Sequence, residues 1–524
     1  MNQVVVCPEP LAATAGAEIL RIGGSAIDAA VAAAYAQAVV SPAMYTVAGT
    51  GVMNIFHAPT GRHVVLDFLG RAGSLARPDM FVGVSPSDRV VGYRSVAVPT
   101  FVRGTHTAFA LFGSRRVSWE RVLEPAIRYA EEGFLVYPYM HQYWRADNPL
   151  QQNRIPFDGF RMLSVTESCA AIFTTGRRVH NLGERIVQRD LAQTLRRIAA
   201  EGPDDFYSGE IGRRIADDLR KHGATVTAED LASCSVAPVD PLLGSYRGYT
   251  IATDAFPNVG VFLIEVMNIL ETEDVGALGA GSVTYFEVMA HALSCAFRDR
   301  VRLAEDPGAT ADDRLRLSSK SYARDLAARV EPPRGEKAGE APAGTTHVSV
   351  VDREGSAASF THSIGTGSGV VTPGLGFIYN NQLGSYDPRP GRPNSIAPGR
   401  PPVTGGGPTI VVRDGRVRFV IGSPHGYRKV SSMAHVLACL VDFGLTAAAA
   451  VTSPRIHCEH DARHLTEDMF FPLPTPVRDA LATSGYALRP DGYGGRVCLI
   501  EIDAAGHGAF GASDPRGGGG MAEA

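Results

Sequence analysis

The sequence predicts an α+β fold in which helices cover antiparallel sheets within one layered body. Helical periods of apolar residues dominate before about residue 330, and paired strand patterns dominate after residue 344. A run rich in proline, glycine and charge, residues 330–344, separates the two styles. The chain of 524 residues is 45% hydrophobic and 20% charged, so it can bury a large core. Two separate domains are the alternative that these patterns leave open.

The N-terminal part is predicted to contain helices and a strand pair. Residues 10–24, "PLAATAGAEILRIGG", have a helical period that stops at two glycines. The Ala-rich run 25–40 opens with Ser25 and Asp28, which form a capping-box pattern. Residues 52–68 read as two strands around a Pro-Thr-Gly turn. Further amphipathic helices are predicted over 117–135, 189–221 and 283–300, and a strand over 245–256.

The C-terminal part alternates apolar and polar side chains about short turns, as hairpins do. One helix is expected there, over 429–444. The tail 515–524, "PRGGGGMAEA", is expected to be flexible. Hairpins are predicted over 347–363, 408–424 and 496–513.

Composition excludes several classes of partner. The net charge of -4 argues against a nucleic acid or an anionic membrane as the main partner. No basic residue precedes Arg21 and the apolar run 29–40 is short, so we expect no secretory signal, no membrane span and a cytoplasmic protein. Seven cysteines without a CxxC pair suggest reduced thiols.

Two motifs resemble ligand sites but are interpreted otherwise. The glycine-rich run "IGTGSG", residues 364–369, lacks the G-K-[ST] of a phosphate loop and lies between strands, so we interpret it as an active-site loop. His457, His460 and His464 have metal-like spacing, but acidic neighbours and the lack of a second ligand cluster favour a solvated loop. We therefore expect neither a metal nor a cofactor.

A threonine pair follows the glycine- and proline-rich run directly. Gly344 ends the run, and Thr345 opens a strand pattern. A threonine hydroxyl needs a base to act as a nucleophile, and its own α-amine, with a pKa of about 7.7 to 8, is one such base. That amine exists only after cleavage between Gly344 and Thr345. The other interpretation is structural, because threonine is a good strand former.

Long motifs then point to a known family. "TTHVSVVDREGSAAS" closely resembles the segment that opens the small subunit of γ-glutamyltranspeptidases. "GGSAIDAAVA", "GVVTPGLGFIYNNQ", "PTIVVRDG" and "GSP" recur in the family order, from about residue 3 to 470. The resemblance implies a four-layer αββα sandwich of the N-terminal-nucleophile type, with two antiparallel sheets between helices. It also implies a large-subunit-like segment 1–344 and a small-subunit-like segment 345–524, which associate as one intertwined unit.

The resemblance also implies roles for individual residues. Thr345 would be both the autoprocessing residue and the catalytic nucleophile. Ser363 falls where the family has a hydroxyl that supports the nucleophile. His425 and Gly426 fall on a Gly-Gly pair whose backbone N–H groups form the oxyanion hole. His425 would bring a titratable ring close to the chemistry, or else lie in an exposed loop.

The departures from the family pattern cluster around recognition of the glutamyl head group. Leu69 stands where the family has a carboxylate-binding Arg, and Ser385 stands where it has an acidic residue for the amino group. Arg71 and Asp387 lie two residues beyond these positions and are the candidate substitutes. The remaining expected substrate-binding positions are Gln382, which keeps the "NNQ" motif, and Thr404 and Gly405, which replace a Ser-Ser pair; Gly365 replaces an Asn.

The resemblance implies a self-processing hydrolase or acyltransferase, and these substitutions predict that it acts on a small acyl compound other than a γ-glutamyl one. By resemblance to divergent members of the family, the bond would be an amide or a carbon–carbon bond next to a keto acid, and the setting bacterial secondary metabolism such as an antibiotic route. A true γ-glutamyltransferase or glutathione hydrolase with a rearranged head-group site is one alternative. An unprocessed, non-catalytic scaffold is the other.

Overall fold

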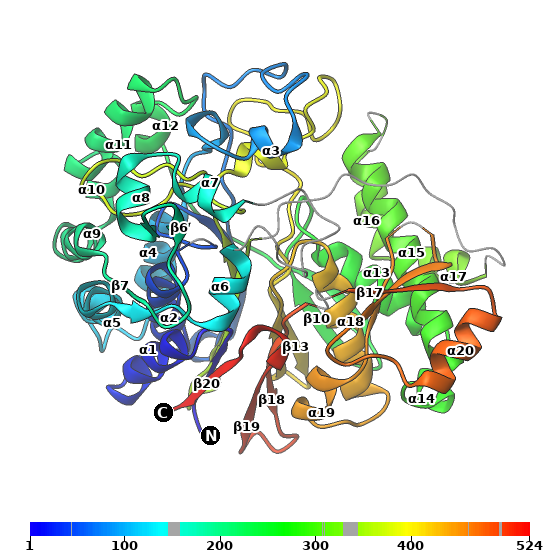
Figure 1. Cartoon of the computed structure of the whole chain (residues 1–524). Helices are drawn as coiled ribbons and strands as arrows, with labels where there is room; N and C mark the ends of the chain where they lie inside the picture. Colours follow the sequence, from blue (N-terminus) through cyan, green and yellow to red (C-terminus); the bar gives the residue numbers. More distant parts are fainter. Residues whose placement is uncertain are drawn as a thin grey trace.

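Two antiparallel sheets face each other at the centre of the molecule (Figure 1). The computed structural model describes residues 1–42, 44–144, 158–306, 308, 310–328, 344–459, 461–491 and 495–524. The first sheet has the strand order β20 (Gly520–Glu523), β1 (Val4–Cys7), β11 (Thr346–Val351), β12 (Ala357–Ser363), β2 (Thr50–His57), β3 (Arg62–Phe68) and β8 (Pro238–Val239). The second has the order β19 (Ala509–Ser513), β18 (Cys498–Ile502), β14 (Arg416–Gly422), β13 (Thr409–Arg413), β10 (Tyr249–Thr253) and β9 (Leu242–Tyr246).

Helices α1 (Pro10–Arg21) and α2 (Ala26–Val40) pack on the outer face of the first sheet, against β1, β11 and β12. Every residue of α2 is buried, because its many alanines let the helix approach both the sheet and its helical neighbours. The capping box forms as predicted: the backbone N–H of Ser25 donates to Asp28 Oδ2 at 2.8 Å. α4 (Phe101–Phe112) packs on β2 and β3 beside α2, whereas α5 (Trp119–Glu132) and α9 (Arg189–Glu201) lie further out.

The second sheet is covered by another set of helices (Figure 1). α13 (Gly260–Leu270) packs on β9 and β10, and α18 (Arg428–Val441) packs on β14. α15 (Val283–Glu305) and α17 (Lys320–Ala327) lie against α13. The smaller helices of this side are α14 (Val275–Leu278), α16 (Ala311–Leu317), α19 (Ala447–Thr452) and α20 (Thr475–Thr483).

Shorter elements surround these layers. The helices are α3 (Pro86–Arg89), α6 (Pro138–Trp144), α7 (Gly159–Leu163), α8 (Glu167–Phe173), α10 (Pro203–Tyr207), α11 (Glu210–Lys221) and α12 (Ala228–Ala232). Three small sheets pair β4 (Phe134–Leu135) with β7 (Arg185–Ile186), β5 (Thr174–Thr175) with β6 (Arg178–Val179), and β15 (Ile456–His457) and β17 (Ala487–Asp491) with β16 (His464–Asp468).

The core has one apolar cluster between each pair of adjacent layers. One cluster joins the first sheet to its helices, and another joins the second sheet to its own. A third fills the space between the two sheets, with Val6 and Val351 on one side and Val420 and Ile500 on the other. The mixed helix and sheet fold is thus held together by burial of apolar surface at every layer.

The C-terminal tail is not a free end in this structure, which corrects the expectation of flexibility. Residues 520–523 form the edge strand β20 and pair with β1, with Val4 opposite Glu523. Gly518 and Gly519, with φ of 97° and 65°, make the turn that returns the chain to the sheet. These glycines serve a backbone conformation that other residues rarely adopt, rather than flexibility.

Two other predicted elements are subdivided. The helix expected over 189–221 is interrupted at Gly202, which has φ of 79° and is followed by Pro203, and again at Gly209. The strand expected over 245–256 is a hairpin, because Arg247 and Gly248 both have positive φ and reverse the chain between β9 and β10. The apolar period alone does not indicate such breaks.

Both large sheets take strands from either side of residue 344.

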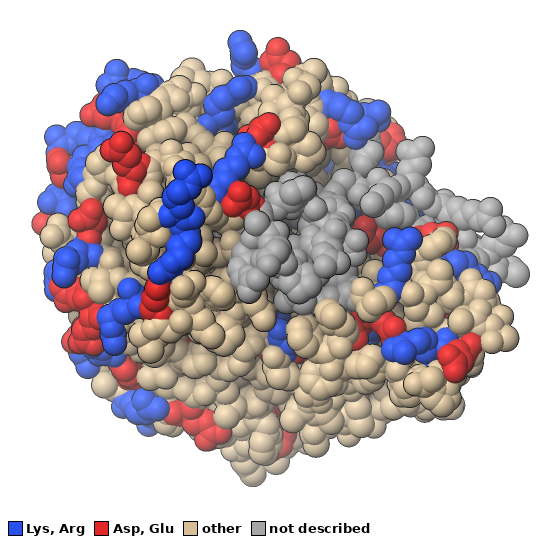
Figure 2. Space-filling view, in the orientation of Figure 1, with Lys and Arg blue, Asp and Glu red and all other residues tan. Residues whose placement is uncertain are grey.

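On the face seen in Figure 2, basic and acidic side chains are interspersed. Within the ranges that the structure describes, no helix has both the length and the apolar character needed to cross a membrane.

Candidate active site

The candidate nucleophile lies at the end of the central strand pair of the first sheet. Thr345 immediately precedes β11, and Ser363 is the last residue of β12. The antiparallel register pairs Thr346 with His362, so Thr345 and Ser363, which adjoin these two residues, lie at the same end of the strand pair. Thr345 is buried, with 9% of its surface exposed.

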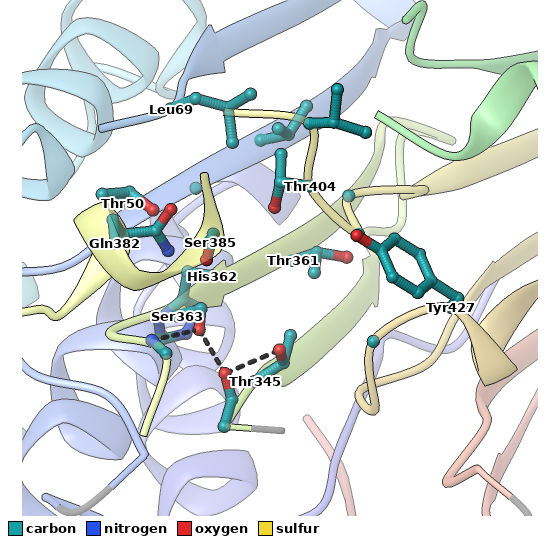
Figure 3. A pocket seen from close by; sticks show the side chains of 18 residues that line it. Thr50, Leu69, Thr345, Thr361, His362, Ser363, Gln382, Ser385, Thr404 and Tyr427 are labelled. Carbon is teal, nitrogen blue, oxygen red and sulfur yellow. Dashed lines mark hydrogen bonds between the residues drawn. The ribbon is translucent and has the colours of Figure 1, made fainter. Parts of the chain in front are cut away.

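Two hydroxyl groups converge on the carbonyl oxygen of Gly344, the residue before the candidate nucleophile (Figure 3). Thr345 Oγ1 donates to this oxygen at 2.7 Å, and the Ser363 hydroxyl also donates to it. The backbone N–H of Gly365 donates to Ser363 Oγ at 2.7 Å, which orients the serine hydroxyl. A nucleophilic hydroxyl therefore lies beside a carbonyl that is already polarised by a second donor.

Gly344 has no room for a side chain. A Cβ atom on this residue would lie 1.5 Å from the carbonyl oxygen of Gly365. The backbone approach that brings the carbonyl of Gly344 to Ser363 is thus available to glycine alone.

A pocket opens beside these groups, with about 550 Å³ of space within and at its mouth. Leu69 lies across the pocket from Thr345 and forms an apolar patch with Val52 (Figure 3). The described residues that line it include no Asp, Glu, Lys or Arg: Thr50, Gly51, Val52, Leu69, Gly344, Thr345, Thr361, His362, Ser363, Gly365, Gln382, Ser385, Val403, Thr404, Gly405, Gly406, Gly426 and Tyr427.

The polar groups of the pocket are neutral. Burial lowers the pKa of His362 to about 3, so its ring is uncharged at neutral pH. Gln382 is 4% exposed, and its Oε1 has no hydrogen-bond partner among the described residues. Thr50, Ser385 and Thr404 add hydroxyl groups. This lining suits an uncharged group with one hydrogen-bond donor better than an amino-acid head group.

Neither Arg71 nor Asp387, the candidate substitutes for the missing head-group residues, is among the described residues that line the pocket. Arg71 is exposed on the surface. Asp387 forms an ion pair with Arg389, with contacts of 2.9 and 2.7 Å. That ion pair and burial act in opposite directions, and the pKa of the Asp387 carboxyl is lowered overall.

His425 and Gly426 have separate surroundings. Both have positive φ, 85° and 50° respectively, and Gly426 lines the pocket. His425 is buried, 3% exposed, and its Nε2 forms a hydrogen bond of 3.0 Å with Tyr139 Oη. The ring is therefore neither in an exposed loop nor among the residues that line the pocket.

Two buried ionisable side chains near Thr345, Arg496 and Glu9, were not predicted. Arg496 Nη2 donates to the carbonyl of Thr345 at 3.4 Å, and its guanidinium lies 4.0 Å from the centre of the Tyr139 ring. Glu9 accepts from Gln37 Nε2 at 2.6 Å, and burial raises the pKa of its carboxyl despite the opposing effect of Arg496. The sequence signal was weak: Glu9 merely precedes the predicted helix 10–24, and Arg496 opens the predicted hairpin 496–513.

The histidine-rich motif does not form a metal centre in the described chain. His457 bonds Ser431 at 2.8 Å and Glu459 at 3.3 Å, and His464 bonds Asp461. His460 lies outside the described residues. No group of three or more metal-binding side chains is found in the part of the chain that the structure describes.

Comparison with known proteins agrees with this arrangement. The chain belongs to the gamma-glutamyltranspeptidase family, whose model matches residues 12–524. It is accordingly an enzyme of the N-terminal-nucleophile hydrolase and acyltransferase class.

Two curated relatives differ in their named activity. The chain is 36% identical to the Acylase ACY 1 proenzyme of Pseudomonas sp. (strain V22) over 501 residues, which cover 92% of this chain and 86% of that protein. It is 31% identical to the Glutathione hydrolase proenzyme of Escherichia coli (strain K12) over 480 residues, 87% of this chain and 80% of that protein.

A solved structure similar to this fold is the cephalosporin acylase from Bacillus halodurans. Its TM-score is 0.87 at 27% identity, with 99% of this chain and 95% of that chain covered. The gamma-glutamyltranspeptidase of Helicobacter pylori matches with a TM-score of 0.56 at 31% identity, over 62% of this chain and 90% of that chain.

Proposed function

We propose that the protein is a self-processing threonine-nucleophile acylase that acts on an uncharged acyl group other than γ-glutamyl. The observation that carries this proposal is the pocket itself, which contains Leu69 and Val52 but no charged side chain among its described lining residues. Amino-acid head groups need charged partners, and losing one such contact costs about 2 to 5 kcal/mol. The acylase relative at 36% identity supports the same conclusion.

The geometry at Gly344 supports a self-cleavage step. Thr345 Oγ1 attacks the carbonyl carbon of Gly344, and the developing oxyanion receives the hydrogen bond of Ser363. The proton of the hydroxyl goes to the leaving amide nitrogen, so the peptide bond becomes an ester. Water then hydrolyses the ester and leaves Thr345 as the first residue of a new chain with a free α-amine.

In turnover the new α-amine would accept the proton of the Thr345 hydroxyl as that oxygen attacks the substrate. Gly426 lines the pocket, and we assign its N–H and that of His425 to the oxyanion. Water, or an amine acceptor, would resolve the acyl-enzyme. The four-layer αββα sandwich that we assign to this fold has the candidate nucleophile at the end of a central strand.

The cytoplasmic location and the secondary-metabolic setting stay predictions from the sequence. The glutathione hydrolase relatives favour a second candidate function, a γ-glutamyl hydrolase with another way to hold the head group.

Hydrolysis of a γ-glutamyl p-nitroanilide and of a panel of uncharged acyl p-nitroanilides separates the two functions. We expect the wild type to cleave at least one uncharged anilide and to show little activity on the γ-glutamyl one. A low KM for the γ-glutamyl anilide, with discrimination against its des-amino analogue, would contradict the proposal and favour the γ-glutamyl hydrolase.

A further inference from the structure

A buried lysine binds the loop that forms one wall of the pocket. The loop, residues 404–407, has the sequence Thr-Gly-Gly-Gly, and its first three residues line the pocket. Lys429 is 1% exposed, and its Nζ donates to the carbonyl oxygen of Gly405. Burial of an ammonium group is unfavourable unless the group is well bonded, so its position here calls for a specific role.

Two further buried side chains bind the same loop. The N–H of Gly406 donates to Asn258 Oδ1 at 3.2 Å, and the N–H of Gly407 donates to Asp254 Oδ2 at 2.8 Å. A Cβ on Gly406 would lie 2.3 Å from both of these acceptor oxygens, so the glycine allows their close approach. Three consecutive loop residues are thus each bound by a different buried side chain.

The loop also contacts the candidate oxyanion residue. A Cβ on Gly405 would lie 3.0 Å from the carbonyl oxygen and 3.1 Å from the carbonyl carbon of Gly426, so the two backbones are packed together. Lys429 is the second residue of α18 and follows Gly426 by three positions. It therefore connects the loop 404–407 to the segment that carries the candidate oxyanion residues.

The same network reaches the opposite wall. Asn258 Nδ2 donates to Asp67 Oδ2 at 3.3 Å, and the N–H of Leu69 donates to Asp67 Oδ1 at 3.1 Å. Asn258 thus bonds both the glycine loop and the carboxylate that positions Leu69. These buried hydrogen bonds therefore connect the two walls of the pocket.

We propose that Lys429 is a positioning residue that holds the loop 404–407 against Gly426 and thereby sets the geometry of acyl binding and turnover. The inference rests on the proposed function for the identity of the reaction. The inference goes beyond the proposed function because it assigns the alignment of the loop 404–407 with the segment that carries Gly426 to one side chain, Lys429, which does not line the pocket.

Self-cleavage should not depend on the hydrogen bond between Lys429 and the loop 404–407, which we call the clamp. The hydrogen bonds described at the carbonyl of Gly344 come from Thr345 and Ser363, and Ser363 is in turn bonded by Gly365. None of these donors belongs to the loop 404–407 or to α18. A positioning role therefore predicts that turnover and self-cleavage respond differently, whereas a general loss of stability would affect both.

The first arm of the test compares Lys429→Met and Lys429→Arg with the wild type, with the exposed Lys221→Met as a matched control. Mass spectrometry follows self-cleavage, and steady-state kinetics use the uncharged acyl p-nitroanilide that the wild type cleaves best. We expect Lys429→Met to self-cleave at the wild-type rate but to lose roughly 10- to 100-fold in kcat/KM. Lys429→Arg should restore part of that loss, because it retains a donor.

Unchanged kinetics in Lys429→Met would overturn the proposal. An equal loss of self-cleavage and turnover would also overturn it, because it would indicate a merely structural lysine.

A second arm does not depend on the substrate. Backbone hydrogen exchange is measured by mass spectrometry on peptides covering 403–408 and 424–428, with a peptide from β12 as the internal reference. We expect exchange in both stretches to be about tenfold faster in Lys429→Met, as expected for loss of one hydrogen bond.

If no anilide of the panel is cleaved by the wild type, the proposed substrate class fails while this arm still judges the clamp. Unchanged exchange in both stretches would refute the clamp whatever the substrate.

Discussion

At the residue scale, the geometry around Gly344 separates the chemistry of processing from that of turnover. The carbonyl oxygen of Gly344 accepts from the hydroxyls of Thr345 and Ser363 before any peptide bond is cut. Ser363 therefore contacts this carbonyl in the uncleaved chain, which the family resemblance alone did not specify. We propose that its hydroxyl is the donor to the oxyanion of self-cleavage.

Substitution of Ser363 should slow self-cleavage selectively. Ser363→Ala removes a donor from the scissile carbonyl, and we expect processing to fall by about 100- to 1,000-fold. Ser363→Thr keeps the hydroxyl and should process close to the wild-type rate. The time course of the 345–524 fragment on a denaturing gel measures both. Equal rates for Ser363→Ala and the wild type would remove the serine from the mechanism.

His425 should not be the general base. Its Nε2 is bonded to Tyr139 Oη and its ring does not line the pocket, so the α-amine of Thr345 remains the candidate. Activity on the anilide should rise with pH through the pKa of that amine, which in model compounds is about 7.7 to 8. We expect this acidic limb to persist in His425→Gly.

The control for that profile is Tyr139→Phe, which removes the hydroxyl partner of His425 but keeps the ring over Arg496. Disappearance of the acidic limb in His425→Gly would identify the imidazole as the base instead.

The pocket could be predicted only where a family motif covered it. Leu69, Gln382, Ser385 and Thr404 were predicted from aligned positions and do line the pocket. Tyr427 also lines the pocket and lies across from Gln382 in Figure 3, but it had no local signal, because its placement depends on how α18 packs rather than on its own neighbours in the chain.

Gly405 shows a further limit of position-by-position reasoning. Restoring the family's serine there would place a Cβ 3.0 Å from the carbonyl oxygen of Gly426. Variants that rebuild the head-group site should therefore combine Leu69→Arg with Ser385→Asp and keep Gly405.

At the element scale, α13 and α15 bury a carboxyl group within an apolar interface. Glu265 of α13 is fully buried, and burial together with Asp299 of α15 raises the pKa of the Glu265 carboxyl well above its usual value. Arg298 and Arg302 oppose this shift but do not reverse it. The folded state therefore retains a proton that the unfolded chain releases above about pH 4.

This difference in proton binding predicts how stability changes with pH. As pH rises above about 4, the unfolded chain loses the proton of Glu265 before the folded state does, because burial raises the pKa of this carboxyl in the fold, so this group lowers the free energy of unfolding. Glu265→Gln removes the titration. We expect the melting temperature of Glu265→Gln to exceed that of the wild type at about pH 8 by ~1 °C or more.

The melting temperatures of the two proteins should converge near about pH 4, where the unfolded chain also holds the proton. A parallel offset at every pH would show that Glu265 is ionised in the fold.

Turn chemistry explains which elements the sequence predicted correctly. The capping box at Ser25 and the hairpin pattern over 408–424 are local signals, and both elements formed as expected. The prediction of a flexible tail over 515–524 was wrong because its glycines suggested disorder. They instead make a turn that lets residues 520–523 pair with the distant strand β1. Pairing of residues more than 500 positions apart leaves no local pattern.

At the scale of the whole molecule, the two segments on either side of Thr345 share both sheets. In the first sheet, β11 pairs with β1 and β12 pairs with β2. In the second, β13 pairs with β10. Cleavage of the peptide bond before Thr345 would leave all of these pairings in place, because they consist of hydrogen bonds between strands and do not involve that peptide bond.

The processed fragments should therefore behave as one folding unit. We expect fragments 1–344 and 345–524 to elute together from a gel-filtration column in native buffer, and to unfold in a single transition in denaturant. Separation of the fragments without denaturant would show that the shared sheets do not hold them. The uncleaved Thr345→Ala protein is the matched control, because it has the same pairings in one chain.

The central claim is that Thr345 cuts the chain before itself and then acts as the nucleophile. Mass spectrometry of the purified wild type and of Thr345→Ala, together with their anilide hydrolysis, tests it most directly. We predict that the wild type consists of fragments 1–344 and 345–524 and is active, while Thr345→Ala remains one inactive chain. An active wild type that stays uncut, a cut at another peptide bond, or cleavage of Thr345→Ala would contradict the account.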